Sequence, residues 1–570
     1  RLHQFISRGD NVYATVESEA TRHIAVEGQR LAPGRRPLLP ICFCRECGQE
    51  YYTVRQTVGE SGDAVLAPRD LGDGYSSDDE GDPGFLYIST RTPWPEDTLQ
   101  QARRVPADWL DPVYEEPVIA SSQRKYVPRN VTVTAEGIIG PSGHAAAWLP
   151  APFRFCLECG VSYSARLRSD LTKLAMLGAG GRSTATTVLG MKVTLEIRKQ
   201  ARDLGSGVPP KMLSFTDNRQ DASLQAGHFN DFVHVGLIRG ALVRAVKDAP
   251  DGIRHNDLTR AVADALGLPF EAYARNPEAR FGRAKVDQAL RNAVGYELYL
   301  DLRRGWRVTS PNLEQCGLLR IEYEELAELC EAEDVWETRH AALSGASPEI
   351  RHEVLRVLLD HMRRELAINV VFLDPERQDG LRSESDQNLA DPWALDMDDQ
   401  FVQWQLLYPR PARQGDRRSG VLLSARGGYG LYLGRPTTLS AAGKLTMQER
   451  EQIIAELIEA LCLADIVERV QEPRDDDDVP GYQLKSGSLI WRAGDGQPVH
   501  DPIRIPTLPE GGGRVNEYFR RFYEEVGAHL LGIEAREHTA QVTAEERIER
   551  EERFRENRLP ILFCSPTMEL

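Results

Sequence analysis

Long apolar runs are absent from this sequence of 570 residues. No stretch approaches the roughly 18 uninterrupted apolar residues that cross a bilayer, and the first residues contain no apolar core of a signal peptide. Positive charge is also in deficit, since 69 Lys and Arg residues stand against 86 Asp and Glu residues, a net charge of −17. We therefore expect a cytoplasmic protein with no membrane partner. The charge argues against a histone-like basic binder, although a local basic stripe is enough to hold nucleic acid.

Neither end of the sequence resembles the natural end of a protein. The chain starts at Arg1 without an initiator Met, and it stops at Leu570, six residues after the apolar run 559–564. Its 570 residues are about three to four times the usual domain length of roughly 150 residues. Hydrophobic residues at 41% and charged residues at 27% are typical of a folded globular chain. We expect a fragment of a longer protein.

Cysteine is scarce, and nine residues are too few for a disulfide-stapled scaffold. Four of the nine stand in two copies of the pattern F-C-x-E-C-G-x-x-Y, with Cys44 and Cys47 in one copy and Cys156 and Cys159 in the other. A two-residue gap lets both thiolates of a tight turn reach one ion, and the following Gly frees the backbone to turn beneath them. Two such knuckles supply the four thiolates of a structural Zn²⁺ site. Two unrelated buried pairs, or a redox C-x-x-C, are the alternatives.

The two knuckles lie unusually far apart, because 108 residues separate Cys47 from Cys156 where roughly 15–20 is common. An inserted loop would explain the distance, and residues 72–84 are acidic and turn-rich, as a solvated insertion should be. Cys42 has no counterpart in the second copy, where Arg154 stands, so we interpret it as a packing residue. The other cysteines stand singly in apolar surroundings and are expected to be small buried residues: Cys316, Cys330, Cys462 and Cys564.

The chain from residue 183 onward has the order of elements found in α/β sheets. The expected elements are a helix from Ser183, a loop over 205–210, a short buried strand over 211–216, a polar turn over 217–221 and a helix from Ala222. Near the end, a charged exposed helix over 545–554 precedes a strand over 559–564 and another polar turn. Open α/β sheets bind their ligands at such turns, at the carboxyl ends of the strands.

Residues 240–530 are expected to be mostly helical. Apolar residues spaced by three and four predict helices over 353–368 and 448–463. Two strand-like segments follow the second helix, which suggests a winged-helix module over 435–497. The acidic run 475–478 would be its solvated wing tip, and because that tip would repel phosphate, the module would pack against protein instead of DNA.

Three segments, taken in order along the chain, read LSFTDNRQDA (213–222), EHTAQ (537–541) and CSPTMEL (564–570). They resemble motif IV, the lead-in to motif V and the start of motif V of superfamily 2 helicases. Motif IV has the S-x-S-R-Q-D-A form of bacterial DEAD/DEAH-box helicases related to the mitomycin-repair and phage-defence types. The paired knuckles resemble the zinc insertion between the two RecA-like lobes of these proteins, and residues 1–16 resemble the exit from the first lobe.

The resemblance implies an α/β fold in which a large, mostly helical insertion splits a RecA-like second helicase lobe beside a four-cysteine zinc module. The implied parts are the exit from the first lobe (1–40), the zinc module with an acidic insertion (41–165), the start of the second lobe (166–240), the insertion (241–530) and the continuation of the second lobe (531–570). It implies an ATP-dependent helicase that binds DNA, as a single strand or at a junction of single and double strands. The missing first lobe and C-terminal region of the same protein would be its other partners.

The motifs that bind ATP do not occur in the sequence. It has no G-x-x-x-x-G-K-[ST] loop, no DEAD/DEAH box and no arginine-finger motif. Residues 178–184 (GAGGRST) carry Arg in place of Lys and follow no strand, so we interpret them as a helix start. ATP and Mg²⁺ are therefore expected only in the full-length protein, and no catalytic residue is assigned here.

A helicase lobe holds phosphates with hydroxyl groups and backbone amides at strand ends, and such contacts position a strand without reading its sequence. The resemblance places these contacts on three turns, at Thr216, Asn218, Arg219 and Gln220, at His538 and Thr539, and at Ser565 and Thr567. A basic segment with one aromatic residue adds Arg303, Arg304, Trp306 and Arg307, since Trp can stack a base while Arg neutralises phosphate. Turn capping is the alternative for the turn residues.

An ordinary solvated face is the alternative for the basic segment, and also for a second basic cluster formed by Arg410, Arg413, Arg417 and Arg418. The alternative for the whole chain is a zinc-stabilised interaction or regulatory scaffold without motor activity. Under the helicase hypothesis, DNA repair and phage defence are both compatible with the residues.

Overall fold

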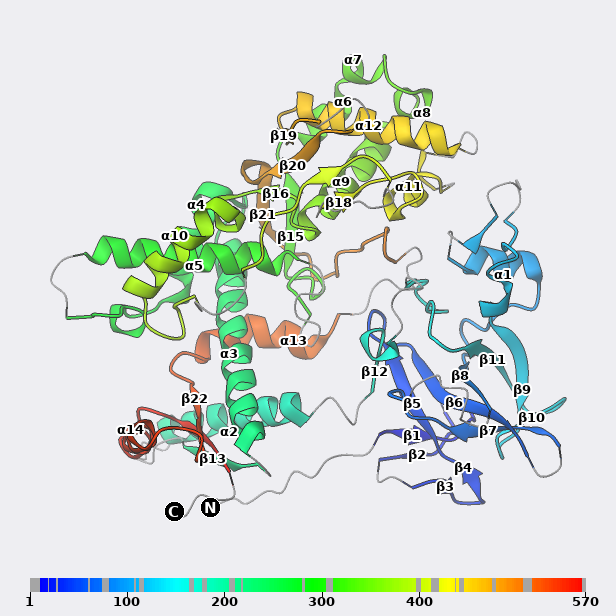
Figure 1. Cartoon of the computed structure of the whole chain (residues 1–570), viewed down its shortest axis with the longest axis horizontal. Coiled ribbons are helices and arrows are strands. Elements are labelled where there is room, and N and C mark those ends of the chain that lie inside the picture. The colour runs from blue at the N-terminus through cyan, green and yellow to red at the C-terminus, as the bar shows by residue number, and fades with distance from the viewer. Residues whose placement is uncertain are drawn as a thin grey trace. The chain divides into compact units, whose positions relative to one another are not determined.

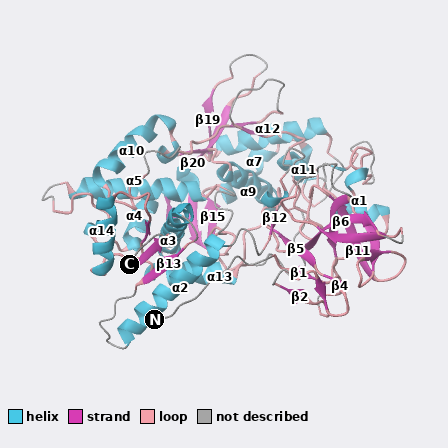
Figure 2. Cartoon of the chain, turned by 60° about the horizontal axis from the view of Figure 1, so that its bottom comes forward, coloured by secondary structure: helices cyan, strands magenta, loops and turns pink. Residues whose placement is uncertain are grey.

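The computed structural model is a mixed α/β chain that divides into two compact units (Figures 1 and 2). The first unit comprises residues 1–193 and 504–513, and the second comprises residues 194–503 and 514–570. The structure describes residues 11–18, 20–26, 29–59, 62–73, 81–106, 109–111, 117–163, 169–176, 182–203, 211–216, 219–278, 282–303, 311–395, 401–411, 420–435, 437–439, 445–473, 478–505 and 515–565.

The first unit consists mainly of strands, which Figure 2 draws in magenta. Among the described residues that precede Arg182, the unit contains one α-helix, α1 (Thr98–Arg104). Its strands are β1 (Tyr13–Ala14), β2 (Ile24–Ala25), β3 (Leu31–Ala32), β4 (Arg36–Pro37), β5 (Leu39–Cys44), β6 (Glu50–Val58), β7 (Ala64–Pro68), β8 (Asp82–Tyr87), β9 (Arg129–Val133), β10 (Ile138–Ile139), β11 (His144–Pro150) and β12 (Leu174–Ala175).

Six of these strands close into an antiparallel barrel. The pairing runs β6–β7–β10–β9–β11–β8, and β8 returns to β6 with Tyr52 opposite Leu86 and Gln56 opposite Asp82. Closure leaves no free edge among these six strands, which removes the usual risk of edge-to-edge pairing. Strand β5 pairs with the start of β6 and carries the first knuckle at its end, while β1 and β12 both pair with β5.

Parts of β6, β8 and β11 are buried on both faces, since consecutive residues there are buried and successive side chains of a strand point to opposite sides. Tyr52, Leu86 and Trp148 belong to one apolar cluster, which draws on every barrel strand and fills the inside of the barrel. Their neighbours in sequence, such as Tyr51 and Phe85, belong to a second cluster that also contains the four knuckle cysteines. The two cysteine turns therefore pack on the outer face of the barrel wall.

The structure corrects the expected loop insertion between the knuckles. The chain between Cys47 and Cys156 is not a simple acidic loop, because it forms the six barrel strands and α1. Residues 74–80, the most acidic part of the stretch 72–84, lie outside the described residues. Residues 13–44 are also part of this unit, since β1 and β5 pair with each other and β5 continues into β6.

The second unit contains a three-stranded parallel sheet in the order β13–β23–β22. The segments that build this layer are β13 (Met212–Phe215), α3 (Arg219–Lys247), β22 (Ala535–His538), α14 (Ala544–Arg555) and β23 (Ile561–Cys564). Helix α2 (Arg182–Asp203) precedes β13 in the chain, and the division between the two units falls within it. Helix α3 packs against the sheet through Phe229, whose ring lies 6.2 Å from that of Phe563. Asn230 of α3 also exchanges two hydrogen bonds with the backbone of Ala535, at 2.8 and 2.9 Å.

The expected strand and helix positions in this layer are confirmed within a few residues, but β13 is not a buried strand. It forms one edge of the sheet, and Leu213 and Phe215 are exposed on the same face. Strand β23 lies between its two neighbours and is buried throughout. Helix α14 is charged and has no buried residue in its length, as its sequence predicted.

The chain between β14 and α13 carries most of the helices of the second unit. The helices are α4 (His255–Leu266), α5 (Arg283–Asp301), α6 (Leu326–Glu331), α7 (Glu333–Trp336), α8 (Ala341–Ser344), α9 (Pro348–Arg364), α10 (Pro375–Asn388), α11 (Gly428–Leu433), α12 (Met447–Leu463) and α13 (Glu517–Arg521). The strands are β14 (Ile253–Arg254), β15 (Leu319–Tyr323), β16 (Ile368–Asn369), β17 (Leu407–Tyr408), β18 (Val421–Leu422), β19 (Val467–Gln471), β20 (Gly481–Lys485) and β21 (Leu489–Ala493).

The segment expected to form a winged helix is divided between two sheets. Helix α12 is followed by the antiparallel pair β19–β20, as a winged helix requires. Strand β21 does not extend that pair, because it joins β15 and β14 in a separate sheet. At the expected wing tip, Asp478 is not solvated, since its side chain is 4% exposed and lies 4.0 Å from Arg410. Residues 474–477 lie outside the described residues.

Helix α9 ends earlier than its apolar pattern predicted, because Leu366 has a left-handed backbone with φ of 58°. Near the end of α9, the side chain of Arg363 is fully buried. The guanidinium donates to Glu314 at 2.8 Å and to the hydroxyl of Tyr323 at 3.0 Å. A buried guanidinium needs such partners, since an unpaired charge in the interior costs several kcal/mol.

None of the helices in the described parts of the chain is both long enough and apolar enough to cross a membrane. This agrees with the absence of long apolar runs in the sequence.

Replacing Gly84 by Ala should destabilise the barrel. A Cβ atom at Gly84 of β8 would lie 2.4 Å from Trp148 Cζ2 and 2.7 Å from the carbonyl oxygen of Leu149. Overpacking of this kind costs about 1–3 kcal/mol. The first unit should therefore unfold at a lower urea concentration, and tryptophan fluorescence would report the midpoint of that transition. The matched control is Gly140→Ala, because a Cβ there meets nothing within 4 Å. Equal midpoints for the two variants would contradict the packing described here.

Candidate functional site

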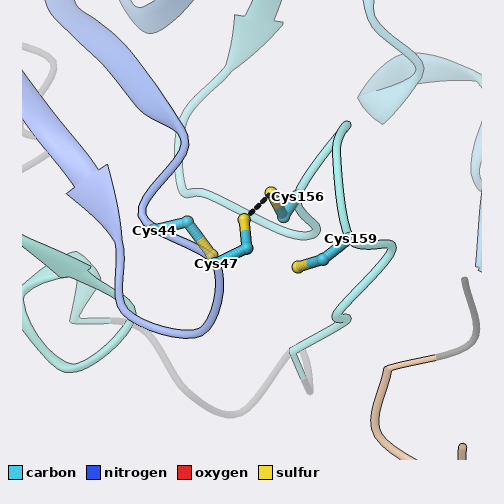
Figure 3. Close-up of side chains that lie close together, drawn as sticks. All are labelled: Cys44, Cys47, Cys156 and Cys159. Carbon is cyan, nitrogen blue, oxygen red and sulfur yellow. Dashed lines mark hydrogen bonds between the residues drawn. The ribbon is translucent and has the colours of Figure 1, made fainter. Parts of the chain in front are cut away.

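The two knuckles adopt the same backbone turn (Figure 3). In the first knuckle, the amide of Gly48 donates to the carbonyl oxygen of Cys44 at 2.9 Å. In the second, the amide of Gly160 donates to the carbonyl oxygen of Cys156 at 3.0 Å. The two glycines have φ of 75° and 72°, in the left-handed region that favours Gly. The glycine of the repeated pattern is therefore required by the turn, as the sequence predicted.

The turns bring four sulfur atoms together from segments that are more than a hundred residues apart. The Sγ atoms of Cys44, Cys47, Cys156 and Cys159 all lie within 4.8 Å of one another, and those of Cys47 and Cys156 are 3.7 Å apart. Tetrahedral zinc with Zn–S bonds of about 2.3 Å places its sulfurs about 3.8 Å apart. The set therefore fits a metal such as zinc, held by four cysteines and closed to further ligands.

Burial and mutual hydrogen bonding set the ionisation of these thiols. Hydrogen bonds with Cys156 and Cys159, together with burial, raise the pKa of the Cys44 thiol well above its ordinary value. The pKa of Cys159 is also raised, first of all by its hydrogen bond with Cys156. Burial alone would raise the pKa of Cys156, but the hydrogen bonds that it accepts from its neighbours hold that pKa well below the usual range.

Without a cation, the four thiols cannot all ionise, since the pKa values of Cys44 and Cys159 are raised while that of Cys156 is lowered. Thiolates, and not thiols, bind metals. A divalent cation removes the competition between the four groups because it lets each of them ionise. The donor set thus fits a metal by its chemistry as well as by its distances.

The glutamates of the two repeats hold other segments to the knuckles. Glu46 forms an ion pair with Arg504, and the next residue, Ile505, packs on the same apolar cluster as the cysteines. Glu158 accepts hydrogen bonds from the hydroxyl groups of Thr92 and, at 3.4 Å, Tyr87. The knuckles therefore organise the contacts of chain segments that are distant in sequence.

Sequence reasoning did not identify several residues around the cysteines. Lys173 is fully buried, donates to Asp170 at 3.0 Å, and offers its carbonyl oxygen to the amide of Arg45 in the first knuckle. The hydroxyl of Tyr51 lies 3.2 Å from the Sγ of Cys156. The tyrosine of the repeated pattern was the one available signal for these contacts, whereas Lys173, Arg504 and Thr92 carry no local signal.

The remaining cysteines behave mostly as expected. Cys42 is fully buried, contacts the carbonyl oxygen of Tyr51 at 3.5 Å and is not one of the four clustered sulfurs. Burial also raises its pKa, which opposes ionisation. Cys316, Cys330 and Cys564 are buried, and Cys462 is half-buried. The interpretation of Cys42 as a packing residue is consistent with these contacts.

The three predicted strand ends lie side by side in the parallel sheet. The amide of Thr216 donates to the carbonyl oxygen of Cys564 at 2.9 Å, and the amide of Ser565 donates to the carbonyl oxygen of His538 at 3.3 Å. The side chains of His538, Thr539 and Ser565 are buried, whereas Arg219 and Gln220 are exposed at the start of α3. His538 contacts Glu551 of α14 at 2.9 Å, and Thr539 accepts from the amide of Gln541 at 3.3 Å.

The other predicted nucleic-acid contacts are placed only in part. Arg303 is exposed at the end of α5, and the predicted residues outside the described parts are Asn218, Arg304, Trp306, Arg307 and Thr567. In the second basic cluster, Arg410 is buried beside Asp478 and is not available to a phosphate, while the other three members lie outside the described residues. The predicted helix start at 178–184 is seen as α2, which begins at Arg182.

Comparison of the chain with protein-family models, with curated proteins and with solved structures finds no match.

The four-cysteine assignment predicts about one zinc per chain by elemental analysis of the purified protein. The Cys44→Ser/Cys159→Ser variant should lose that zinc, because it removes one thiolate from each knuckle. The control is Cys42→Ala, which changes a buried cysteine two residues from the site and should keep its zinc. Zinc retained in the double variant would refute this set of ligands.

Zinc affinity should rise between about pH 6 and pH 8, because the metal must displace protons from the thiols. The pKa values of Cys44 and Cys159 are raised in the metal-free protein, so both thiols remain protonated throughout this range. Calorimetric titrations in buffers of different ionisation enthalpy would count the protons released per zinc. An affinity that does not change with pH would mean that other groups bind the metal.

Proposed function

We propose that the chain is part of an ATP-dependent nucleic-acid helicase or translocase of superfamily 2, with DNA as its expected substrate. In this proposal the parallel layer of the second unit belongs to the RecA-like second motor lobe and contributes its strand-binding surface. The four cysteines hold a structural Zn²⁺ ion that stabilises the first unit.

The pairing of β13 with β23 is the observation that supports this proposal most. The segments that resemble motifs IV and V follow these two strands, and Thr216 and Cys564 are 348 positions apart in the sequence. The lead-in to motif V follows β22, on the other side of β23. In open α/β sheets the carboxyl ends of neighbouring parallel strands form the ligand site, so the three motif-like segments meet where a ligand would bind.

The exposure of the predicted residues divides them into two roles. His538, Thr539 and Ser565 are buried and hold the strand ends in place, so they would act through the backbone that they position. Arg219 and Gln220 are exposed in the first turn of α3, which spans 29 residues. A cation and an amide at a helix N-terminus suit a phosphate, because the free backbone amides there favour negative charge.

ATP and Mg²⁺ would bind only in the full-length protein. The sequence lacks the glycine-rich loop that holds the phosphates of ATP, so the missing first lobe would have to supply it. That lobe and the C-terminal region are therefore the expected partners of the chain.

A zinc-stabilised scaffold without motor activity is the alternative function. The burial of Thr539 and Ser565 favours it, because hydroxyl groups that serve only to cap turns are expected to be inaccessible to a strand. A direct measurement of nucleic-acid binding separates the two functions.

The helicase proposal predicts that the chain binds a fluorescein-labelled single strand or a single/double-strand junction in an anisotropy titration without ATP. Arg219→Ala/Gln220→Ala should weaken binding several-fold and reduce the salt slope by about one, as expected when one phosphate contact is lost. The control is Arg260→Ala, which removes the same charge from an exposed position on α4. Wild-type protein that binds neither DNA would favour the scaffold instead.

A further inference from the structure

The two knuckles share their sequence pattern and their backbone turn, but the hydroxyl groups of the tyrosines that follow them have different partners. The pattern F-C-x-E-C-G-x-x-Y places Tyr51 and Tyr163 at the same position of the two copies. The hydroxyl of Tyr51 lies 3.2 Å from the Sγ of Cys156, which belongs to the other knuckle. The hydroxyl of Tyr163 contacts the carbonyl oxygen of Lys173 at 3.5 Å.

The direction of the Tyr51 hydrogen bond follows from its second partner. The backbone amide of Leu157 donates to the Tyr51 oxygen at 2.8 Å. A phenol has one proton to donate, and an amide N–H cannot accept one. The proton of Tyr51 is therefore left for the sulfur of Cys156, so Tyr51 is the donor and Cys156 the acceptor.

The hydroxyl of Tyr51 is held in place by packing that does not involve a metal. Tyr51 is fully buried, and its ring lies 5.0 Å from that of Phe153 and 5.5 Å from that of Tyr87. Its backbone lies in β6, where it stands opposite Cys42 of β5. A buried hydroxyl with two protein partners and a fixed ring points its proton in one direction.

We propose that Tyr51 is the positioning residue of the metal centre, that it reaches from the first knuckle to fix the sulfur of Cys156 in the second, and that Tyr163 has no such role. The inference rests on the proposed zinc site. Tyr51 holds Cys156 and the amide of Leu157 together, so the second knuckle is set in its metal-binding shape before the ion arrives. The sequence repeat is thus symmetric in its ligands and asymmetric in the residues that orient them.

The test compares Tyr51→Phe with Tyr163→Phe, which remove one hydroxyl group each from matched positions of the repeat. Zinc affinity is measured in the whole chain by competition with a chromophoric chelator. Tyr51→Phe should bind zinc about 10–100-fold more weakly, the usual effect of losing a group that orients a metal ligand. Tyr163→Phe should bind zinc as the wild type does.

A spectroscopic measurement separates orientation of the sulfur from general loosening of the fold. With Co²⁺ in place of zinc, the sulfur-to-metal charge-transfer bands should shift in Tyr51→Phe, because one sulfur loses its hydrogen bond, and should not shift in Tyr163→Phe. Unchanged affinity in Tyr51→Phe, or an equal loss in both variants, would overturn the inference. Weaker binding with unchanged cobalt bands would overturn it as well, since the hydroxyl would then act only through packing.

Failure of the zinc site itself is distinguishable from failure of this inference. Wild-type protein that takes up neither zinc nor cobalt would refute the metal centre before any variant is compared. Wild-type protein that binds zinc, together with a Tyr51→Phe variant that behaves like wild type, would leave the centre intact and remove only the role of Tyr51.

Discussion

Four thiol groups share one buried corner of the first unit, and they can ionise together only around a cation. That constraint governs the surroundings of the knuckles. Hydrogen bonds within the cluster lower the pKa of Cys156, and the glutamates of the two repeats attach Arg504 and Thr92 to the same place. Each contact joins segments that are distant in sequence, so a metal at this point would stabilise far more of the unit than the two turns that bind it.

The barrel wall links that corner to the rest of the first unit. Strand β6 presents Tyr52 to the inside of the barrel and Tyr51 to the cysteines, so one strand supports both apolar clusters. The second unit depends on a different long-range pairing, in which β13 and β22 flank a strand that follows more than 300 residues after β13. In both units the proposed site is assembled by strand pairing, which fixes the positions of turns that the chain supplies separately.

Local patterns were sufficient to predict the elements whose signals lie within a few residues. The knuckles, helix α12 and the apolar strand β23 are such cases. The barrel was missed because β11, with its run of alanines, is buried on both faces along its middle and shows no alternation of polar and apolar residues, and because β10 is only two residues long. The pairing of Asp478 with Arg410 and the exposure of Phe215 depend on which distant segments approach each other in the fold. A short stretch of sequence does not contain that information.

X-ray absorption at the zinc edge reports the identity and distance of the atoms bound to the metal, and these are the properties that four cysteine ligands would fix. In the purified chain we expect a single shell of four sulfur atoms at about 2.3 Å from zinc. A shell that contains nitrogen or oxygen, or fewer than four sulfurs, would contradict the assignment of Cys44, Cys47, Cys156 and Cys159 as a closed set of ligands.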